Sequence, residues 1–309
     1  MPSTQASPSP ASILAVIVLY NRQLWQSQCV SSLIRILNGD PALAKHFSLV
    51  LYDNSPQPQS LEVAGGLPIH YVHDPSNGGL APAYNFALAR AESEGREWLL
   101  LFDQDTSLTV DFLVELVTLA TTLQGQTSVA AIVPKLLVKG MVYSPATHFI
   151  DVLRGQFSRP APNTYDTLLG IQEHRLNVYN SASTLRVSAL RSIGAFPMEF
   201  WLDYLDHTVF HTLFVKGYSI YVMHASLEHE QSDEDLQSVS AWRHHNVLRA
   251  QTLFVKRTGN PIDRLLYRIW LLRHSRKLRS LCTDKRVWRE TALQALLLRV
   301  SEPGRPNKN

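Results

Sequence analysis

The sequence predicts an α/β fold, in which a mainly parallel, Rossmann-like sheet has helices on both faces and is followed by a helical C-terminal extension. Two observations lead to this prediction. Apolar runs at residues 13–20, 47–52 and 98–102, interrupted only by Ser48, are typical of strands that are buried on both faces. Helical patterns separate these runs at the spacing of strand–helix–strand units, which is how parallel strands are joined.

The length and composition are those of an ordinary globular protein. The chain has 309 residues, 45% hydrophobic and 18% charged, so it can bury a sizeable core. Residues 1–12 are rich in Pro, Ser and Ala and lack a basic start, which predicts a disordered tail rather than a signal peptide. Cys29 and Cys282 lie in different regions, which favours a reducing, intracellular setting. No apolar run approaches the ~20 residues needed to span a bilayer.

Residues 13–137 alternate regularly between strand and helix patterns. Besides the three apolar runs, we expect strands at residues 69–73 and 129–137. We expect helices that end near residue 37 and that cover residues 81–94 and 109–123. This half is predicted to form a doubly wound, ligand-binding layer.

The second half of the chain has a less regular pattern. Residues 139–175 contain Gly and Pro in several places, which predicts loops and short strands. We then expect an extended segment at 178–187, helices at 188–193 and 203–215, and a strand at 218–223. Three further helices are expected at 238–256, 262–281 and 285–300.

Two carboxylates, Asp103 and Asp105, directly follow the strand predicted at residues 98–102. In α/β sheets, ligands bind just beyond the carboxyl ends of the strands. An Asp-x-Asp pair at that place suits Mg²⁺ or Mn²⁺, because carboxylate oxygens satisfy a hard cation and leave room for phosphate oxygens. The alternative is that the two acids cap the helix beginning near Thr109. The triplet alone does not decide between these interpretations.

Polar residues also follow the other strands of the first half. The four groups are Tyr20-Asn21-Arg22, Asp53-Asn54-Ser55, Asn77-Gly78-Gly79 and Asp103-Gln104-Asp105. Each group alone could be turn chemistry, but together they would lie at one edge of the sheet. Asp53 can accept the imide N–H of uracil or thymine, and Gly78 and Gly79 permit close backbone approach to a ligand. The chain has no phosphate-binding G-x-x-x-x-G-K-[ST] loop and no G-x-G-x-x-G fingerprint, which argues against NTP hydrolysis and dinucleotide redox chemistry.

An ordered set of motifs between about residues 13 and 256 carries a family resemblance. The motifs are VIVLYNR, YDNS, NGGLAPAYN, LLLFDQDT, NSASTLRVSALRSIGAF, FWLDYLDH, LEH and WRHHN. Together they resemble family 2 glycosyltransferases of the GT-A fold, and most of all the bacterial rhamnosyltransferases, in which DQD is followed by Thr or Ser. The resemblance implies a catalytic domain at 13–237, with a nucleotide-sugar-binding half at 13–137 and an acceptor-side half at 138–237. Residues 238–309 are then a basic helical extension.

The resemblance implies an inverting, metal-dependent transfer of a sugar. The expected donor is dTDP-L-rhamnose, and the expected acceptor is a bacterial cell-surface polysaccharide or a lipid-linked glycan. A UDP-hexose donor and a non-catalytic sugar-nucleotide- or glycan-binding protein are the alternatives. Mg²⁺ or Mn²⁺ would be bound by Asp103, Asp105 and His229, although His229 could instead be a hydrogen-bonded histidine in a loop. The residues expected to contact the nucleotide sugar are Tyr20, Asn21, Arg22, Asp53, Asn77, Gly78, Asn85, Asp103 and Gln104.

Asp206 matches the catalytic base of the family. Inverting transfer needs one carboxylate to take the proton from the acceptor hydroxyl, while the metal stabilises the departing diphosphate. Asp203 lies three residues earlier and would share a helix face with Asp206, and its alternative role is a helix N-cap or first-turn acid. The family usually continues with an acidic residue and later an Arg, whereas this chain continues with His207 and has no such Arg. This departure affects the expected acceptor contacts and leaves the donor motifs intact.

The C-terminal end is strongly basic. Residues 256–309 contain 14 Lys or Arg and 4 Asp or Glu, whereas the rest of the chain contains 15 Lys or Arg and 22 Asp or Glu. Apolar and basic residues alternate at helical spacing within 262–281, which suits a helix at a membrane interface. A helix docked on the body with a solvated basic face is the alternative, and nucleic-acid binding lacks a recognised motif. We expect a cytoplasmic protein with a peripheral contact to the inner membrane.

Overall fold

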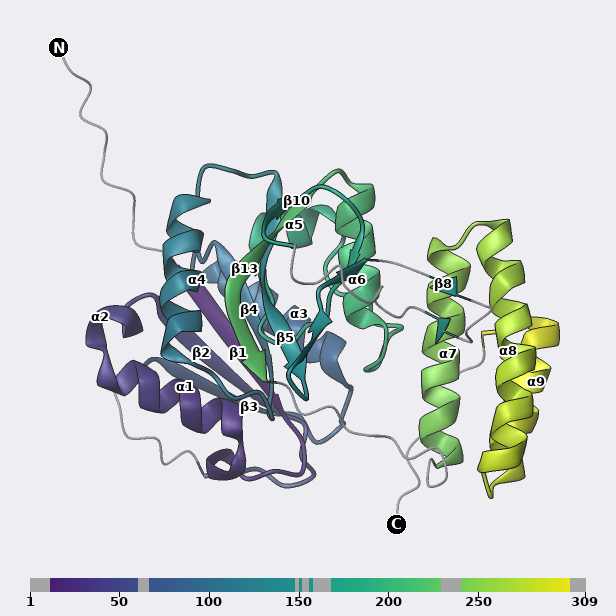
Figure 1. Ribbon diagram of the computed structural model, residues 1–309. Coiled ribbons are helices and arrows are strands. Elements are labelled where there is room, and N and C mark those ends of the chain that lie inside the picture. The colour runs from purple at the N-terminus through teal and green to yellow at the C-terminus, as the bar shows by residue number, and fades with distance from the viewer. Residues whose placement is uncertain are drawn as a thin grey trace.

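The structure is a computed structural model that describes residues 12–60, 67–147, 150–151, 156–157, 168–228 and 240–300. Its centre is a nine-stranded sheet with the order β10-β13-β5-β12-β4-β1-β2-β3, to which β6 is added beside β5. The main strands are β1 (Ile13–Leu19), β2 (Phe47–Asp53), β3 (Ile69–His73), β4 (Trp98–Asp103), β5 (Val129–Val138), β12 (Thr184–Arg186) and β13 (Ser219–Glu228). The predicted α/β fold with a mainly parallel sheet is confirmed (Figure 1).

Short strands fill the irregular middle of the chain, as expected. They are β6 (Met141–Ser144), β7 (Ala146–Thr147), β8 (Ile150–Asp151), β9 (Gln156–Phe157), β10 (Gly170–Gln172) and β11 (Leu176–Asn177). The segment expected to be extended at 178–187 contributes only the three residues of β12. β12 lies antiparallel between β4 and β5, and β10 lies antiparallel to β13, so the sheet is mixed at this side.

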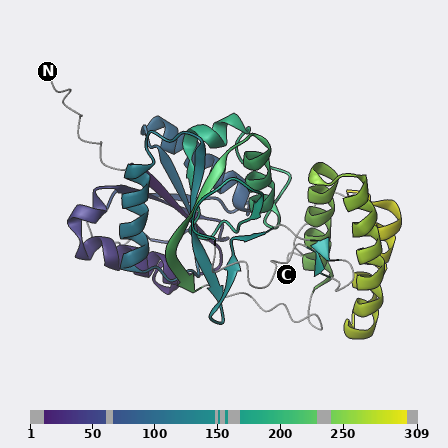
Figure 2. The ribbon, with the colours of Figure 1, turned by 45° about the horizontal axis from the view of Figure 1, so that its top comes forward.

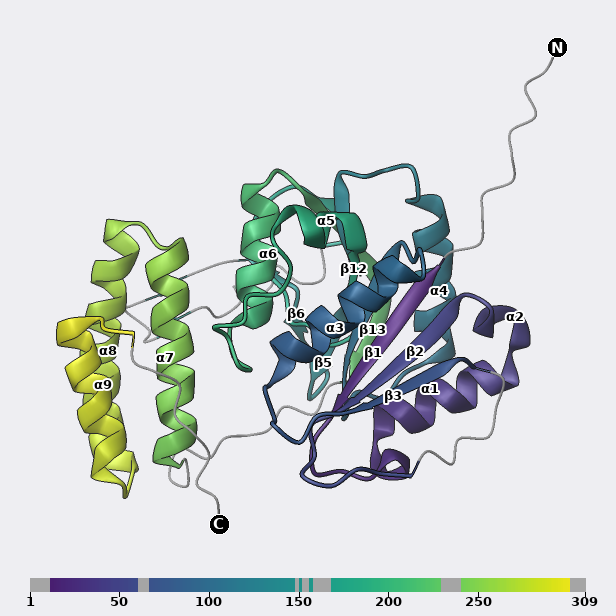
Figure 3. The ribbon, with the colours of Figure 1, turned by 180° about the vertical axis from the view of Figure 1, so that it is seen from behind.

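Helices cover both faces of the sheet. They are α1 (Gln28–Gly39), α2 (Pro41–Ala44), α3 (Leu80–Ser93), α4 (Val110–Thr122), α5 (Val187–Ser192) and α6 (Leu205–Val215), with a 3-10 turn η1 (Leu24–Gln26). Alternate residues of β1 enter two separate buried clusters. Leu14 and Val16 pack with residues of α3, α5 and α6, and Ile17 packs with residues of α1 and α4. Figure 3 shows α3, α5 and α6 on the face opposite to the one seen in Figure 1.

The start of α4 decides between two interpretations of the acid pair. Thr109 is the N-cap of this helix, because its hydroxyl oxygen accepts the Phe112 backbone N–H at 3.2 Å. Neither Asp103 nor Asp105 caps it. The interpretation of Asp103 and Asp105 as caps of this helix is therefore wrong.

Three long helices form the C-terminal part. They are α7 (Ala241–Thr258), α8 (Pro261–Leu281) and α9 (Lys285–Leu297), and they lie side by side next to the sheet and its covering helices (Figure 2). Tyr267, Leu271 and Leu278 of α8 and Val287 of α9 are almost completely buried. Phe254 of α7 and Tyr267 of α8 belong to the same apolar cluster as Leu14 and Val16, so the bundle extends the core of the body. Within the part of the chain that the structure describes, no helix is long and apolar enough to cross a membrane.

Candidate active site

The polar groups that follow β1, β2, β3 and β4 lie at one edge of the sheet. In the parallel register, Leu19 of β1 pairs with Asp53, Asp53 pairs with His73, and Val18 pairs with Asp103. The backbone N–H of Tyr20 donates to Gln104 Oε1 at 3.0 Å, and that of Asn21 donates to Ser55 Oγ at 3.0 Å. Hydrogen bonds therefore connect three groups that are far apart in the sequence.

Asp53 is completely buried at this edge, and its carboxylate is already engaged. Oδ1 accepts the Ser55 backbone N–H at 2.9 Å, and Oδ2 accepts the Tyr71 hydroxyl at 2.7 Å and the Gln59 amide at 3.0 Å. Burial above all, together with the bond to Asp53, raises the pKa of Tyr71, which keeps its phenol protonated as a donor. A nucleotide base can reach Asp53 only after the side chains that cover it move.

The Asn77-Gly78-Gly79 loop is fixed by Trp201. The indole N–H of Trp201 donates to the Asn77 carbonyl at 2.9 Å, and the Leu80 backbone N–H donates to the Trp201 carbonyl at 2.8 Å. Gly79 has φ +88°, and a Cβ there would lie 2.0 Å from the Trp201 oxygen, so only glycine fits. The loop expected to close over the donor is thus joined to the FWLDYLDH segment of the acceptor side.

Asp103, Gln104 and Asp105 are half-buried at the end of β4, and each has a different environment. The Ser181 hydroxyl donates to Asp103 Oδ2. Gln104 holds neighbouring loops, because its side-chain oxygen accepts the Tyr20 N–H and its carbonyl accepts the Ser27 hydroxyl at 2.7 Å. Asp105 Oδ1 is buried and has no hydrogen-bond partner among the residues that the structure describes.

The environment of Asp105 fits a divalent cation. A buried carboxylate oxygen without a partner is costly, and a cation bound there would remove the cost. Burial, and after it the charges of Asp103 and Asp105, raise the pKa of the Cys29 thiol well above its ordinary value. The thiol therefore stays protonated. Among the described residues no group of three or more His, Cys, Asp or Glu could hold a metal, and His229 lies outside those residues.

Asp203 and Asp206 have different roles. Asp203 accepts both guanidinium nitrogens of Arg243 in α7, one of them at 2.8 Å. The N-cap residue of α6 is Tyr204, with φ 61° and no side-chain cap, so the interpretation of Asp203 as an N-cap is wrong. Asp206 lies in the first turn of α6 and is 11% exposed. Its Oδ1 accepts the backbone N–H of His207 at 2.7 Å, and its Oδ2 has no hydrogen bond to any residue that the structure describes.

Tyr84 of α3 contacts the Asn180-Ser181 segment, which also holds Asp103. Its phenol is completely buried and accepts the Asn180 amide at 2.7 Å. Burial first, and then the charges of Asp103 and Asp206, raise its pKa well above the ordinary value, so a neutral phenol lies near both acids. Ser181, next to Asn180, holds Asp103. The sequence motif NSAST contains Asn180 and Ser181, but no sequence signal indicated that they bind Tyr84 and Asp103.

Asn85 and Arg22, which are also expected to contact the nucleotide-sugar donor, form hydrogen bonds within the protein. Asn85 clamps the loop after α5, since its Oδ1 accepts the Phe196 N–H at 3.0 Å and its Nδ2 donates to the Phe196 carbonyl at 2.8 Å. The Arg22 carbonyl accepts the Gln59 amide at 3.0 Å, whereas its guanidinium has no hydrogen bond within the described part of the chain. Tyr20 is 43% exposed and Asn21 is exposed with φ 49°, so both face the solvent side of the edge.

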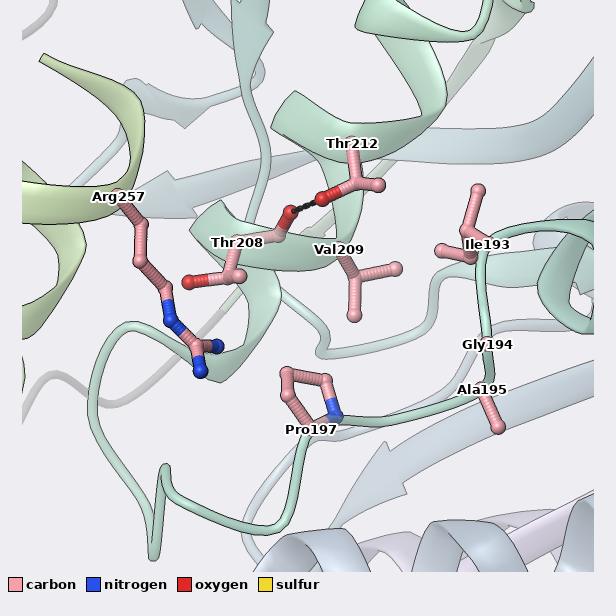
Figure 4. A pocket seen from close by; sticks show the side chains of 8 residues that line it. All are labelled: Ile193, Gly194, Ala195, Pro197, Thr208, Val209, Thr212 and Arg257. Carbon is pink, nitrogen blue, oxygen red and sulfur yellow. Dashed lines mark hydrogen bonds between the residues drawn. The ribbon is translucent and has the colours of Figure 1, made fainter.

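A small cavity of about 130 Å³ lies outside this site (Figure 4). Its lining residues are Ile193, Gly194, Ala195, Pro197, Thr208, Val209, Thr212 and Arg257. The Thr208 and Thr212 hydroxyls donate to carbonyls one turn earlier in α6, and Arg257 pairs with Glu199. None of the sequence-predicted site residues lines it, and we assign it no ligand.

Comparisons with known proteins identify the family and the fold of this chain. The family model for glycosyl transferase family 2 matches residues 14–193. Residues 1–349 of TarS from S. aureus superimpose with a TM-score of 0.54 at 15% identity, over 93% of this chain and 81% of that one. The same TarS fragment in complex with UDP-GlcNAc gives a TM-score of 0.54 at 16% identity, over 92% and 79%.

A third solved structure is the mannosyltransferase PcManGT from Pyrobaculum calidifontis in complex with GDP-Man and Mn²⁺. It superimposes with a TM-score of 0.50 at 15% identity, over 93% of this chain and 76% of that one. A search of curated protein sequences finds no match. At these identities the solved structures show the GT-A fold alone, and the family model extends over more than half of the chain. The chain belongs to glycosyl transferase family 2.

Proposed function

We propose that this protein is an inverting glycosyltransferase that uses Mg²⁺ or Mn²⁺ and a nucleotide-sugar donor. The observation that carries the proposal is a pair of acidic positions, Asp105 after the end of β4 and Asp206 in the first turn of α6. At one, Asp105 has a buried oxygen without a partner. At the other, Asp206 Oδ2 has no hydrogen bond among the described residues. Such an arrangement can bind a diphosphate at one end and accept a proton at the other.

In the proposed reaction, Asp206 Oδ2 takes the proton of the acceptor hydroxyl. The acceptor oxygen then forms a bond to the anomeric carbon, while the bond from that carbon to the diphosphate oxygen breaks. A divalent cation held by Asp103 and Asp105, with His229 as the third expected ligand, would neutralise the charge on the departing nucleoside diphosphate. The Asn77-Gly78-Gly79 loop, fixed by Trp201, positions the donor side against the α6 side.

The proposed donor is dTDP-L-rhamnose, on the basis of the DQD-Thr motif at residues 103–106. A UDP-hexose is the alternative donor, and the TarS complexes contain UDP or UDP-GlcNAc. The contacts proposed for the nucleotide sugar are Tyr20, Asn21, Arg22, Asp53, Asn77, Gly78, Asn85, Asp103 and Gln104. Three of them, Asp53, Asn85 and Gln104, also hold the surrounding loops. A non-catalytic sugar-nucleotide-binding protein would keep these contacts and lack turnover.

Thermal unfolding with a panel of nucleotide sugars tests the donor and metal site. We expect dTDP-L-rhamnose with Mn²⁺ or Mg²⁺ to raise Tm by several degrees, because a ligand at 100 times its Kd stabilises by about 2.7 kcal/mol. Asp105→Asn should abolish the metal-dependent part of the shift. Asp111→Asn, which changes an exposed acid in the first turn of α4, is the matched control and should retain it. Equal shifts with and without metal would contradict the metal site, and no shift with any nucleotide sugar would contradict the donor site.

The acceptor is proposed to be a polysaccharide or lipid-linked glycan at the inner face of the bacterial inner membrane. Support comes from an apolar face on α8 and α9, defined by Ile262, Leu265, Ile269, Leu272, Leu293, Leu296 and Leu297, which are 40–66% exposed. On α8 its members are three or four residues apart, opposite the buried Tyr267 and Leu271. The Arg268 guanidinium donates to the Leu296 carbonyl at 3.1 Å, which brings the two leucine-rich ends together.

Basic residues surround the opposite end of the same two helices. They are Arg273, Arg276, Lys277, Arg279, Lys285, Arg286 and Arg289, all of them exposed. A leucine-rich surface beside exposed Arg and Lys matches an anionic bilayer, which takes apolar side chains into its interface and attracts positive charge. The α8–α9 face is therefore proposed as a peripheral contact with anionic lipid.

Vesicle flotation of the full chain tests this contact. We expect binding to vesicles with anionic phosphatidylglycerol, weaker binding to neutral phosphatidylcholine, and a decline with added salt. The double variant Leu265→Ser/Leu296→Ser should lose most of the bound fraction. Val110→Ser/Val114→Ser, on exposed positions of α4, is the matched control and should bind like the wild type. Equal binding by both double variants would contradict the proposed face.

A further inference from the structure

His207 occupies the position directly after Asp206 and is bound to it. Its Nδ1 lies 2.9 Å from Asp206 Oδ1, the oxygen that also accepts the His207 backbone N–H at 2.7 Å. An ionised carboxylate only accepts hydrogen bonds, so Nδ1 carries the proton in this pair. Two N–H groups of one residue therefore hold the same oxygen of Asp206.

The surroundings of His207 hold its ring in one orientation. The side chain is 8% exposed, and its ring meets those of Tyr179, Tyr204 and Phe254 edge-on at centroid distances of 5.2, 5.3 and 6.1 Å. Burial raises the pKa of both Tyr179 and Tyr204 well above the ordinary value, so these neighbours are neutral. A ring packed in this way cannot swing aside, and its Nδ1–H stays directed at Asp206.

The bond from Nδ1 determines which oxygen of Asp206 is available. The terminal torsion of an aspartate side chain is broad and roughly two-fold, so its two oxygens exchange easily unless one of them is held. The backbone N–H of His207 alone could bind either oxygen of Asp206. The second, rigidly placed donor fixes Oδ1 and leaves Oδ2 as the accepting atom.

We propose that His207 is a positioning residue that orients the Asp206 carboxylate toward the acceptor hydroxyl. The inference rests on the proposed function, in which Asp206 is the base. His207 does not contact the reacting atoms and acts through Asp206 Oδ1. A misplacement of about 1 Å in such a group costs on the order of 100-fold in rate.

Two substitutions separate the hydrogen bond from the packing of the ring. His207→Phe keeps a ring and removes the donor, whereas His207→Asn removes the ring and keeps an N–H two bonds from Cβ, as in Nδ1. With a fixed donor and acceptor, we expect kcat of His207→Phe to fall about 10- to 100-fold, with KM for the donor within about threefold. We expect His207→Asn to retain kcat within about threefold and to have the lower Tm of the two. If the ring of His207 served only for packing, His207→Phe would instead have the higher kcat of the two variants.

Wild-type kcat in His207→Phe, or an equal loss of kcat in both variants, would overturn the positioning role. Should His207→Phe fail to fold, His207→Ala replaces it in the same comparison with His207→Asn. Asp206→Asn, measured in parallel, separates this inference from the proposed function. If Asp206→Asn retains full kcat, the assignment of the base has failed. If Asp206→Asn is inactive and His207→Phe is fully active, only the role of His207 has failed.

Discussion

Asp206→Asn is expected to lower kcat by about 10²- to 10⁴-fold, the range contributed by general acid–base catalysis. Asparagine has nearly the same shape and keeps an oxygen that can accept the two N–H groups of His207. The donor binds at the other acid site, so its affinity should change by no more than about threefold. The measurement is the rate of nucleoside diphosphate release at saturating donor, together with donor binding by calorimetry.

Asp203→Asn is the control for this substitution. It weakens the pairing with Arg243 between the α6 region and α7 and leaves Asp206 intact, so kcat should remain within about tenfold of the wild type. If Asp203→Asn stops turnover in a folded protein while Asp206→Asn does not, the base is Asp203. Similar moderate losses in both variants would show that neither carboxylate takes the proton.

Arg186→Leu is expected to cost about 3–5 kcal/mol of unfolding free energy, as for the removal of one partner from a buried ion pair. Arg186 is 2% exposed in β12 and pairs with Glu97. Its guanidinium donates to the carbonyls of Val129 at 2.9 Å and Leu123 at 2.8 Å, and it lies 4.1 Å from the Trp98 ring centre. Leucine would remove these hydrogen bonds and the ion pair with Glu97, although the Leu123 carbonyl would keep the Gln126 backbone N–H as a donor.

Urea unfolding at 25 °C measures this cost, with Arg191→Leu as the control. Arg191 pairs with Glu92 on the surface, where the two side chains are 44% and 37% exposed, so its loss should cost less than about 1 kcal/mol. Equal midpoints for the two variants would contradict the structural role of Arg186.

The sequence predicted the parallel core of the fold because that core is locally encoded. The apolar runs that became β1, β2 and β4 contain one polar residue, Ser48, and the polar groups directly after them are short-range signals. Their carboxyl ends meet because parallel strands run in the same direction, so the position of Asp103 and Asp105 at the edge followed from the pattern. The antiparallel insertion of β12 between β4 and β5 could not be predicted, since three residues carry no periodic signal.

Long-range contacts set the limit of what could be predicted about the site. Asp53, Gln104 and Asn85 are predicted to contact a ligand, and the structure shows that their polar atoms also hold other parts of the protein. Nothing in the residue type distinguishes these two uses. Trp201 and Asn180 reach the site from more than 80 residues along the chain, as in the bond of Asn180 to Tyr84, 96 residues away. Such pairings depend on the packed fold rather than on local spacing.

Turnover of a nucleotide sugar with and without a divalent cation tests whether this protein is a metal-dependent glycosyltransferase. The full chain is incubated with dTDP-L-rhamnose or UDP-sugars in Mn²⁺ or in EDTA, and the released nucleoside diphosphate is measured for the wild type and for Asp105→Asn. We expect turnover of one donor in Mn²⁺, and a loss of at least about 100-fold in EDTA or in Asp105→Asn, because metal ions stabilise the leaving group by several kcal/mol. Binding of the donors without any turnover, or turnover that is the same in EDTA, would contradict this expectation.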